Sequence, residues 1–445
     1  MNLLSYVLAI LVALQPAVVV AKTVVAHVVV GVTLDDHTKD TWYEDITLAH
    51  AAGIDGFALN IVPPFNGAGG CATQISYAFG AANDFRDRTG NAFKMFFMFD
   101  YLGKPGRPWT ADEIVEILGG PYHDNGAMLT INGQPVVSTF EGGDHAGDWP
   151  SIRARSGGIH LVPDWEGSGG PNFIQSHLGT VDGAFSWDMW PEYPTWVDSL
   201  PDAEYKRVLA GKTYMMGVSP WFYTDLPEYN KHRVWRGDDL WHDRWQQAIS
   251  LQPDIVQIVT WNDFGEAHYI GPIRDGGIPA NAKSYVQNMP HDAWRQLLPY
   301  YIAQYKSPGS AVAAEQLVYW YRLTSASVPG KKGPFDDVTG NNCEYETCYD
   351  PATVVQDKVF FTAILKSAAS VVVKIGNNAE TTFTASGAGA FHASLPFNGQ
   401  TGVVSIRVVR NGQTVGGLQS SGAAIQGSAP NGVINYNAWV GGASA

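Results

Sequence analysis

The chain repeats one pattern of apolar and polar positions between residues 24 and about 264. A short apolar run ends in polar or aromatic side chains, and a polar or Gly/Pro-rich loop and usually a helical pattern follow it. Near-continuous apolar runs of this length are typical of strands in a parallel sheet that is buried on both faces. The runs with this pattern are 24–31, 54–60, 93–100, 135–142, 159–165, 183–190, 214–223 and 254–263.

Apolar residues at helical spacing lie between several of these runs. In the first such segment, Trp42, Ile46, Ala49 and Ala52 recur every three or four residues, and Gly53 is placed to end the helix. Eight strands alternating with helices predict a (β/α)8 TIM-type barrel. A doubly wound open sheet is the alternative, but no Gly-x-Gly-x-x-Gly follows a strand to favour its nucleotide-binding version. The helical segments include 41–53, 110–120, 239–251 and 291–306.

The pattern changes after about residue 310. Short β-branched runs divided by turns replace the helical segments, and residues 410–413 (Arg-Asn-Gly-Gln) carry the Asn-Gly signal of a β-hairpin. A chain of 445 residues also exceeds what one hydrophobic core usually holds. We therefore predict a catalytic barrel at 22–311 and a β-sandwich at 312–445.

The first 21 residues form an apolar stretch without a charged side chain, which closes in small residues up to Ala21. This pattern predicts a secretory signal peptide that is cleaved near Ala21. An uncleaved signal anchor is the alternative, because the stretch approaches the about 20 residues that span a bilayer. Gln15 and Pro16 make it a poor span. We therefore expect a secreted protein, extracellular or associated with the cell wall, without a membrane segment after cleavage.

The three cysteines fit an exported protein. Cys343 and Cys348 lie close together in the sequence, and we predict a local disulfide between them. Cys71 is left over and is predicted to be a buried free thiol. No matching Cys/His pair flanks the two close cysteines, so a metal site there is not expected.

The net charge of −14 limits the class of partner. An acidic surface repels phosphate backbones and anionic membranes, which argues against nucleic acid and membrane partners. A neutral substrate suits this charge.

Carboxylates, amides and aromatic rings dominate the C-terminal ends of the predicted strands. In a barrel these ends meet at one face and build the active site. Phosphoryl transfer would need Lys, Arg or a metal, and no Gly-x-Ser-x-Gly elbow ends a strand. Aromatic and carboxylate side chains suit sugar rings, although a histidine inside a strand, such as His27, is more often a satisfied core residue. The predicted sugar-binding residues are His27, Asn60, Asp100, Glu141, Trp187, Asp188, Trp221, Tyr223, Trp261, Asn262, His268 and Tyr269.

Asp263 and Glu266 are the candidate catalytic pair, within the stretch TWNDFGEAHY at 260–269. They lie three residues apart, and Gly265 permits a tight turn between them. Paired carboxylates supply the acid and base of glycosidic cleavage, and a separation of about 6.5–9.5 Å admits the water of an inverting reaction. The alternative is a helix start, with Asp263 as its cap and Glu266 as the capping-box partner.

Glu266 is assigned as the general acid for its longer reach and Asp263 as the base, with Asp100 in reserve as the base.

Several stretches, in order along the chain, resemble the fungal α-1,3-glucanases, or mutanases, of glycoside hydrolase family 71. The resemblance implies a (β/α)8 barrel with a β-sandwich, secretion, and endo-hydrolysis of α-1,3-linked glucose chains with inversion. The family motif Trp-Asn-Asp-aromatic-Gly-Glu falls on 261–266, which implies that Asp263 and Glu266 are the catalytic pair. The sequence departs from the family at Gln257, Phe264 and Ala267, where Glu, Tyr and Ser are usual. The matching stretches are 26–31, 48–61, 93–100, 138–142, 185–191, 214–226, 238–245, 258–272 and 288–306, with a weaker match at 317–322.

We therefore predict a secreted, monomeric endo-α-1,3-glucanase that acts on fungal cell-wall glucan or mutan. It is expected to need no cofactor and no metal. An endo-hydrolase for another glycan, such as a mannan, is one alternative, because barrel enzymes change substrate through their loops. A glycan-binding wall protein without turnover is the other, and the intact pair at 263 and 266 argues against it.

Overall fold

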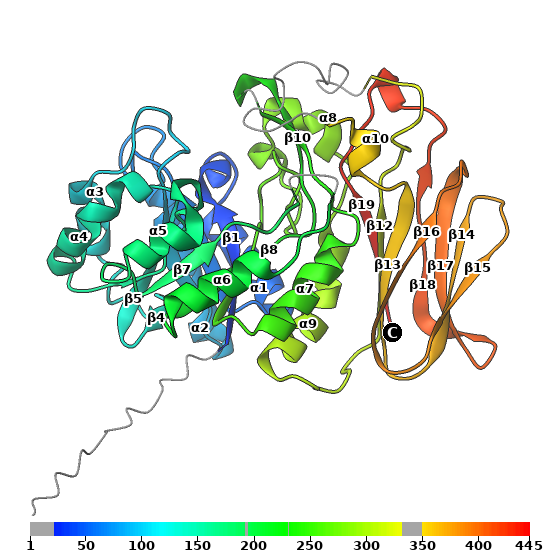
Figure 1. Cartoon of the computed structure of the whole chain (residues 1–445), viewed down its shortest axis with the longest axis horizontal. Coiled ribbons are helices and arrows are strands. Elements are labelled where there is room, and N and C mark those ends of the chain that lie inside the picture. The colour runs from blue at the N-terminus through cyan, green and yellow to red at the C-terminus, as the bar shows by residue number, and fades with distance from the viewer. Residues whose placement is uncertain (1–21, 192–194, 230, 332–348) are drawn as a thin grey trace, which may run out of the picture.

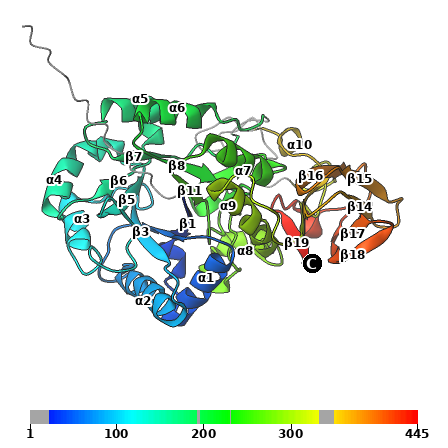
Figure 2. The same cartoon turned by 90° about the horizontal axis from the view of Figure 1, so that it is seen from below.

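The computed structural model describes residues 22–191, 195–229, 231–331 and 349–445. Its N-terminal region is a curled sheet with helices around the outside, and its C-terminal region contains two further sheets (Figures 1 and 2). The predicted signal peptide at 1–21 and the predicted Cys343–Cys348 disulfide lie outside the described residues.

Each of the eight predicted apolar runs contains one strand of the curled sheet, and neighbouring strands of these eight are parallel. The order across the sheet is β6-β5-β3-β2-β1-β11-β8-β7, and β4 (Thr130–Ile131) pairs antiparallel with β5. The strands are almost entirely buried because helices cover their outer face. Their bounds are β1 Thr23–Val29, β2 Gly56–Ile61, β3 Lys94–Asp100, β5 Gln134–Phe140, β6 His160–Leu161, β7 Gly183–Ser186, β8 Thr213–Val218 and β11 Ile255–Ile258.

The two end strands of this order, β6 and β7, approach each other. Asp182 N donates to Leu161 O at 2.9 Å, and Phe185 N donates to Pro163 O at 2.8 Å. The sheet therefore curls until its edges share two backbone hydrogen bonds. The fold is of the mixed α/β type, and the strands end on one side, where Figure 1 shows the loops of the upper edge.

The helices follow the predicted segments, with one correction. Gly53 has φ of +91°, as expected for the residue that ends the first helix. The predicted helix at 291–306 is not continuous: a 3₁₀ segment at Asp292–Leu297 precedes it, and Pro299 lies in the first turn of the α-helix, where its missing N–H costs nothing. The bounds are α1 Lys39–Ala51, α2 Ala72–Thr89, α3 Ala111–Leu118, α4 Trp149–Arg155, α5 Gly170–Ser176, α6 Leu200–Leu209, α7 Leu240–Leu251, α8 Lys283–Val286, α9 Leu298–Lys306 and α10 Pro351–Val354.

The C-terminal region holds two four-stranded antiparallel sheets, ordered β16-β13-β12-β19 and β15-β14-β17-β18. One apolar cluster draws on both sheets. The predicted hairpin is confirmed: Arg410 pairs with Gln413, and Asn411 and Gly412 both have positive φ, as a type I′ turn requires. The strands are β12 Gln316–Tyr321, β13 Lys358–Leu365, β14 Ala369–Ile375, β15 Thr381–Ala385, β16 Gly389–Pro396, β17 Gly402–Arg410, β18 Gln413–Ile425 and β19 Trp439–Ser444.

The two regions share a continuous apolar core. Trp320 of β12 packs against Trp294 with ring centroids 6.1 Å apart, and its Nε1 donates to Asp238 O at 2.7 Å. Trp221 Nε1 donates to Tyr436 O at 3.1 Å. The C-terminal region is therefore packed directly against the loops that follow β8.

His291 makes a second connection between the regions. Its Nδ1 lies 2.9 Å from Tyr269 O, and its Nε2 lies 3.0 Å from Ala438 O. Its ring stacks on Tyr269 with the centroids 3.9 Å apart. The loop after β11 thus rests on the segment just before β19.

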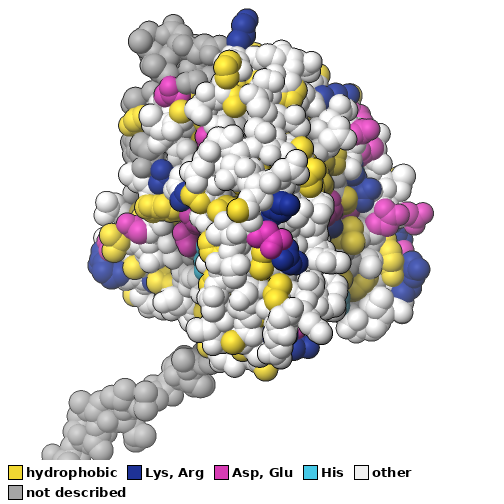
Figure 3. Space-filling view, turned by 90° about the vertical axis from the view of Figure 1, so that its right-hand side faces the viewer, with side chains coloured by type: hydrophobic (Ala, Val, Ile, Leu, Met, Phe, Trp, Pro, Cys, Tyr) yellow, Lys and Arg dark blue, Asp and Glu magenta, His cyan; other side chains and the backbone are white. Residues whose placement is uncertain are grey.

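The surface carries charge sparsely. Figure 3 shows the C-terminal side with its charged side chains scattered among uncharged ones. No helix in the described parts of the chain has the length and apolarity to cross a bilayer. Cys71 is buried and free, as predicted.

Candidate active site

The segment 260–269 leaves β11 as a hydrogen-bonded turn and not as a helix. Thr260 N donates to His268 O at 3.0 Å, and Ile270 N donates to Thr260 O at 3.0 Å, which closes the loop on itself. Asp263 Oδ1 accepts from Glu266 N at 3.0 Å. Only this half of the alternative capping box is present, because the Glu266 carboxylate points elsewhere.

Glu266 contacts two positively charged or hydrogen-bonding groups. Lys231 Nζ donates to Oε1 at 2.5 Å, and His268 Nε2 lies 2.8 Å from Oε2. Lys231 is the first residue of β10 (Lys231–Val234), which pairs antiparallel with β9 (Tyr223–Leu226). This hairpin follows β8, the strand next to β11, so the connection after a neighbouring strand supplies the lysine. The Glu266 side chain is 15% exposed, which makes both contacts stronger than on an open surface.

Thr260 orients the histidine. Its Oγ1 accepts from Asp263 N at 2.8 Å and lies 3.1 Å from His268 Nδ1. An ionised carboxylate can only accept, so His268 Nε2 carries the proton that faces Glu266. One threonine therefore contacts both the backbone of Asp263 and the ring of His268.

The two carboxyl groups are shifted in opposite directions. Burial alone would raise the pKa of Glu266, but the Lys231 charge and the His268 contact outweigh it and hold that pKa well below its usual value. Burial, and then the negative charge of Glu266, raise the pKa of Asp263. When one proton is shared by the pair, it therefore resides on Asp263.

One oxygen of Asp263, one of Glu266 and a ring nitrogen of His268 all lie within 4.8 Å of one another. These donor types can bind a metal ion. Lys231 supplies a positive charge 2.5 Å from one oxygen of the same Glu266 carboxylate.

Aromatic rings line the centre of the sheet beside this pair. Trp190 stacks on His268 at 5.4 Å between centroids. Trp187 contacts Phe140 at 4.8 Å and His27 at 5.5 Å, both edge to face. Burial lowers the pKa of His27 to about 3, so this histidine is neutral. Of these predicted residues, Trp187 is partly exposed and His27 is buried.

Asp100 and Asn60 lie together at the ends of neighbouring strands. Asn60 Nδ2 donates to Asp100 Oδ2 at 3.4 Å, and the other oxygen accepts from Leu102 N and Gly103 N. Burial raises the pKa of Asp100, and these bonds and the Lys231 charge oppose that rise. Asp100 is therefore near enough to Lys231 to feel the same charge as Glu266.

Five other predicted sugar-binding residues are buried. The side chains of three of them, Trp221, Asn262 and Tyr269, form hydrogen bonds with other residues of the chain. Asn262 uses both ends of its amide on Val29, at 2.8 Å to the N–H and 3.1 Å to the carbonyl. Tyr269 donates to Met289 O at 2.5 Å. Such contacts hold the loop after β11 in place. The five, all 5% exposed or less, are Trp221, Tyr223, Trp261, Asn262 and Tyr269.

A second set of carboxylates lies at the ends of β5 and β6. This acidic group consists of Glu141, Asp164 and Glu166, and none of the three forms an ion pair with a described residue. Glu141 Oε1 accepts from Gly167 N at 2.7 Å, and Glu141 itself has φ of +53°. Asp164 is fully buried, and its Oδ2 has no hydrogen-bond partner among the described residues.

Burial favours the protonated form of each acid in this group. It raises the pKa of Glu141, raises that of Asp164 well above its usual value, and raises that of Glu166 to about 7. Tyr205 donates to Glu166 Oε2 at 2.5 Å and opposes the rise. The charge of Asp188, a predicted sugar-binding residue, adds to it.

Sequence reasoning missed Lys231 and Glu166. Lys231 lies in no predicted strand, and only the β9–β10 hairpin brings it to Glu266. Glu166 directly follows the run at 159–165, so the strand-end rule that selected Glu141 could have found it.

Comparison with known proteins gives a family. The sequence model described as glycosyl hydrolase family 71 matches residues 20–445. A mutanase of Penicillium rubens is 33% identical over 449 residues, covering 94% of this chain and 88% of that protein. The glucan endo-1,3-alpha-glucosidase agn1 of Schizosaccharomyces pombe is 32% identical over 437 residues, covering 94% of each.

Among solved structures, the GH99 endo-alpha-mannosidase from Bacteroides thetaiotaomicron is similar to this chain. The match covers 62% of this chain and 81% of that one, with 14% sequence identity and a TM-score of 0.43.

Proposed function

Because the chain belongs to glycosyl hydrolase family 71 and is a glycoside hydrolase, we propose that it is an endo-acting α-1,3-glucanase with Asp263 and Glu266 as its proton-transfer pair. The substrate follows from relatives of about equal length that are named mutanase and glucan endo-1,3-alpha-glucosidase. The observation that carries the site is the opposite pKa shift of two carboxyl groups whose oxygens lie within 4.8 Å. We place the enzyme outside the cell or at the wall, acting as a monomer without metal or cofactor.

Two features of the fold belong to the same proposal. The hydrogen bonds between the β6 and β7 segments support a closed (β/α)8 barrel. The apolar cluster common to the two C-terminal sheets supports a β-sandwich. A boundary at 311/312 falls in the connection between α9 and β12.

The pKa directions support roles opposite to those expected from side-chain reach. Asp263, whose pKa is raised, is the proton donor to the glycosidic oxygen as the bond to the anomeric carbon breaks. Glu266, which Lys231 and His268 keep ionised, accepts a proton from the water that attacks that carbon. The glucan leaves as two chains, and the pair ends with Asp263 ionised and Glu266 protonated.

Inversion is the proposed stereochemical outcome, and the distance between the two carboxyl groups bears directly on it. Inverting enzymes hold their carboxyl groups about 6.5–9.5 Å apart, and retaining enzymes about 5–5.5 Å. The nearest oxygens of Asp263 and Glu266 are within 4.8 Å, so on this proposal the bound sugar and water widen the gap. An initial β-anomer, observed by NMR, supports inversion; an initial α-anomer means retention.

The function is tested by reducing-sugar release from insoluble α-1,3-glucan, beside a panel of other polysaccharides that includes mannan. We expect release from α-1,3-glucan, and a loss of about 10³-fold or more in Glu266→Gln and in Asp263→Asn. Glu116→Gln, an exposed carboxylate on α3, is the matched control and stays active. If the wild-type chain binds the glucan without cleaving it, the proposal is wrong and the protein is a glycan-binding protein.

A further inference from the structure

Trp196 is unusual among the tryptophans of this chain. It is 52% exposed, and every other tryptophan is buried or partly buried in the described residues, which include all 15. It lies on the connection between β7 and α6, the same connection that begins with Trp187 and Asp188 at the strand ends. A half-exposed indole keeps a large apolar face in water, which is informative for a side chain that usually buries its area.

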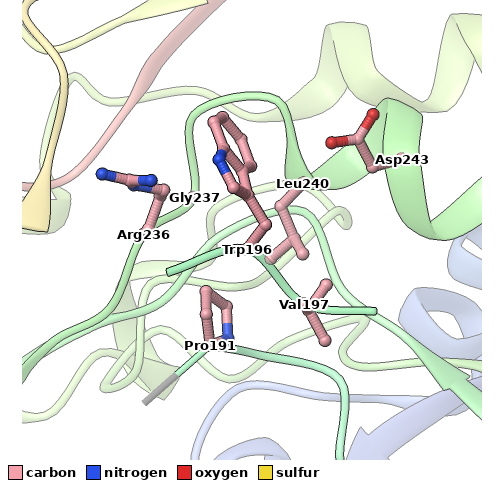
Figure 4. Close-up of a pocket in the computed structure, with 7 residues that line it drawn as sticks. All are labelled: Pro191, Trp196, Val197, Arg236, Gly237, Leu240 and Asp243. Atoms are coloured by element: carbon pink, nitrogen blue, oxygen red, sulfur yellow. The ribbon is translucent and has the colours of Figure 1, made fainter. Parts of the chain in front are cut away.

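The indole stands over a small pocket. Arg236 lies on one side, with its guanidinium carbon 4.8 Å from the ring centroid. Figure 4 shows the indole between the guanidinium of Arg236 and the carboxylate of Asp243, with Pro191 and Val197 below it. The lining of the pocket therefore combines an aromatic ring, apolar walls and two polar groups of opposite charge.

Asp243 provides a second observation, independent of the indole. It lies in the first turn of α7, and its carboxylate has no hydrogen-bond or ion-pair partner among the described residues. Burial raises the pKa of Asp243 to about 6, with the charge of Asp239 adding to the rise. A half-buried carboxylate without a partner gains from a ligand that brings hydroxyl donors.

We propose that Trp196 and Asp243 form a second glucan-binding site, separate from the catalytic pair, that holds one chain of the insoluble polysaccharide. The ring face and apolar walls contact a glucose ring, and Asp243 accepts hydrogen bonds from its hydroxyl groups. The inference rests on the proposed function for its ligand, a neutral α-1,3-glucan.

Size and charge favour this occupant over other partners. Stable protein interfaces bury about 800 Å² on each side, far more than one indole and a small pocket offer. A nucleic acid would bring phosphates to Asp243 on a chain of net charge −14. A narrow, uncharged polymer meets neither obstacle. Two sites on one chain also raise the effective concentration of substrate at the catalytic pair.

Binding to insoluble α-1,3-glucan tests the proposal, with Glu266→Gln as the background so that the substrate survives. Adding Trp196→Ala should weaken binding about 10-fold, and adding Asp243→Asn about 3-fold. Trp196→Phe, which keeps a ring, should stay within about 3-fold of the background. The matched control is Tyr77→Ala, an aromatic on α2 that is 37% exposed, and it should not change binding.

The outcomes separate the two proposals. Unchanged binding in Trp196→Ala or, if that variant does not fold, in Asp243→Asn overturns the second site, while wild-type cleavage of the glucan leaves the proposed function standing. If the wild-type chain does not cleave the glucan but Trp196→Ala weakens binding in the Glu266→Gln background, the proposed function is wrong and the second site stands. An equal loss in Tyr77→Ala also overturns the second site, because the effect is then not specific to Trp196.

Discussion

Two sets of carboxylates lie at the strand ends, and they differ in their neighbours. At the end of β11, Glu266 contacts Lys231 and His268, which hold its pKa well below its usual value. The acidic group, Glu141, Asp164 and Glu166, forms no ion pair within the described parts of the chain, and burial raises all three pKa values. Both sets stand on strands of the same sheet. The charge of Glu266 thus depends in part on a lysine that a distant hairpin delivers.

The difference also separates activity from stability. Two neighbouring acids with opposite pKa shifts can serve as proton donor and proton acceptor. The three pKa values of the acidic group are all shifted upward, and the burial of these acids reduces stability once they ionise.

The same substitution made in each of the two carboxylate sets should give the largest difference in activity. Glu266→Gln should lower kcat/KM on α-1,3-glucan by about 10³–10⁴-fold, because it removes the ionised member of the pair. Glu166→Gln, the same change in the acidic group, should cost less than about 10-fold. Equal losses in the two variants would mean that the acidic group takes part in the chemistry.

Lys231→Met should make the pKa values of Asp263 and Glu266 resemble those of the acidic group, which are all raised. Without the ammonium, the pKa of Glu266 rises, and that of Asp263 rises as well, since Lys231 lowers both. The acidic limb of the pH–rate profile follows ionisation of the base and the basic limb follows loss of the acid's proton, so both limbs move to higher pH. We expect activity at the original optimum to fall about 10–100-fold.

Lys231→Arg keeps the charge and should keep the profile. Lys366→Met, in an exposed turn after β13, controls for a general loss of positive charge. A profile in Lys231→Met that keeps its shape and position would exclude a role for the lysine in setting the protonation of the pair.

The acidic group should appear in the pH dependence of unfolding. The folded chain raises the pKa of Glu166 from 4.5 to about 7, so it binds more protons than the unfolded chain between these values. Its contribution to stability is complete below pH 4.5 and is lost as the pH rises through 7, about 3 kcal/mol in all. Glu166→Gln should remove that loss, as urea unfolding at pH 4.5 and pH 8 would measure.

Glu266 should show the opposite linkage. Its pKa is lowered, so its contribution is present above pH 4.5 and is lost as the pH falls below that value. Glu266→Gln should therefore destabilise the chain at pH 7, where Glu166→Gln stabilises it. The same sign in both variants at pH 7 would contradict the contrast between the two sets.

The smallest expected effect concerns Tyr205. Its hydroxyl donates to Glu166 and is one cause that lowers the pKa of that group. Tyr205→Phe should move the midpoint of the stability change to higher pH and cost about 1–2 kcal/mol at pH 8, where the lost bond is to an ionised acid. The cost should be smaller at pH 5, and an equal cost at both values would show that Glu166 does not titrate between them.

The repeating pattern of the chain was enough to predict the strands, because buried parallel strands must be apolar along their length. The hairpin at Asn411–Gly412 was equally local, since positive φ at both positions favours those two residues. The helix at 291–306 was predicted too long at its start, because apolar spacing continues through a 3₁₀ segment as well as through an α-helix.

The sequence indicates the candidate residues of the site but not their charges. Asp263 and Glu266 stand out locally, but their protonation depends on Lys231, 35 positions away from Glu266 along the chain. No local pattern indicates which of several lysines will arrive there. The buried positions of Trp221 and Tyr269 were likewise hidden, because the C-terminal region covers them only after the fold is assembled.

His291, which links Tyr269 to Ala438, has a consequence for the order of synthesis. The ribosome delivers Tyr269 and the loop after β11 long before Ala438, so that loop emerges without the segment on which it finally rests. A growing chain therefore carries Asp263 and Glu266, the proposed pair, without their finished support. We expect hydrolytic activity to appear only once the ribosome has added the residues around 438.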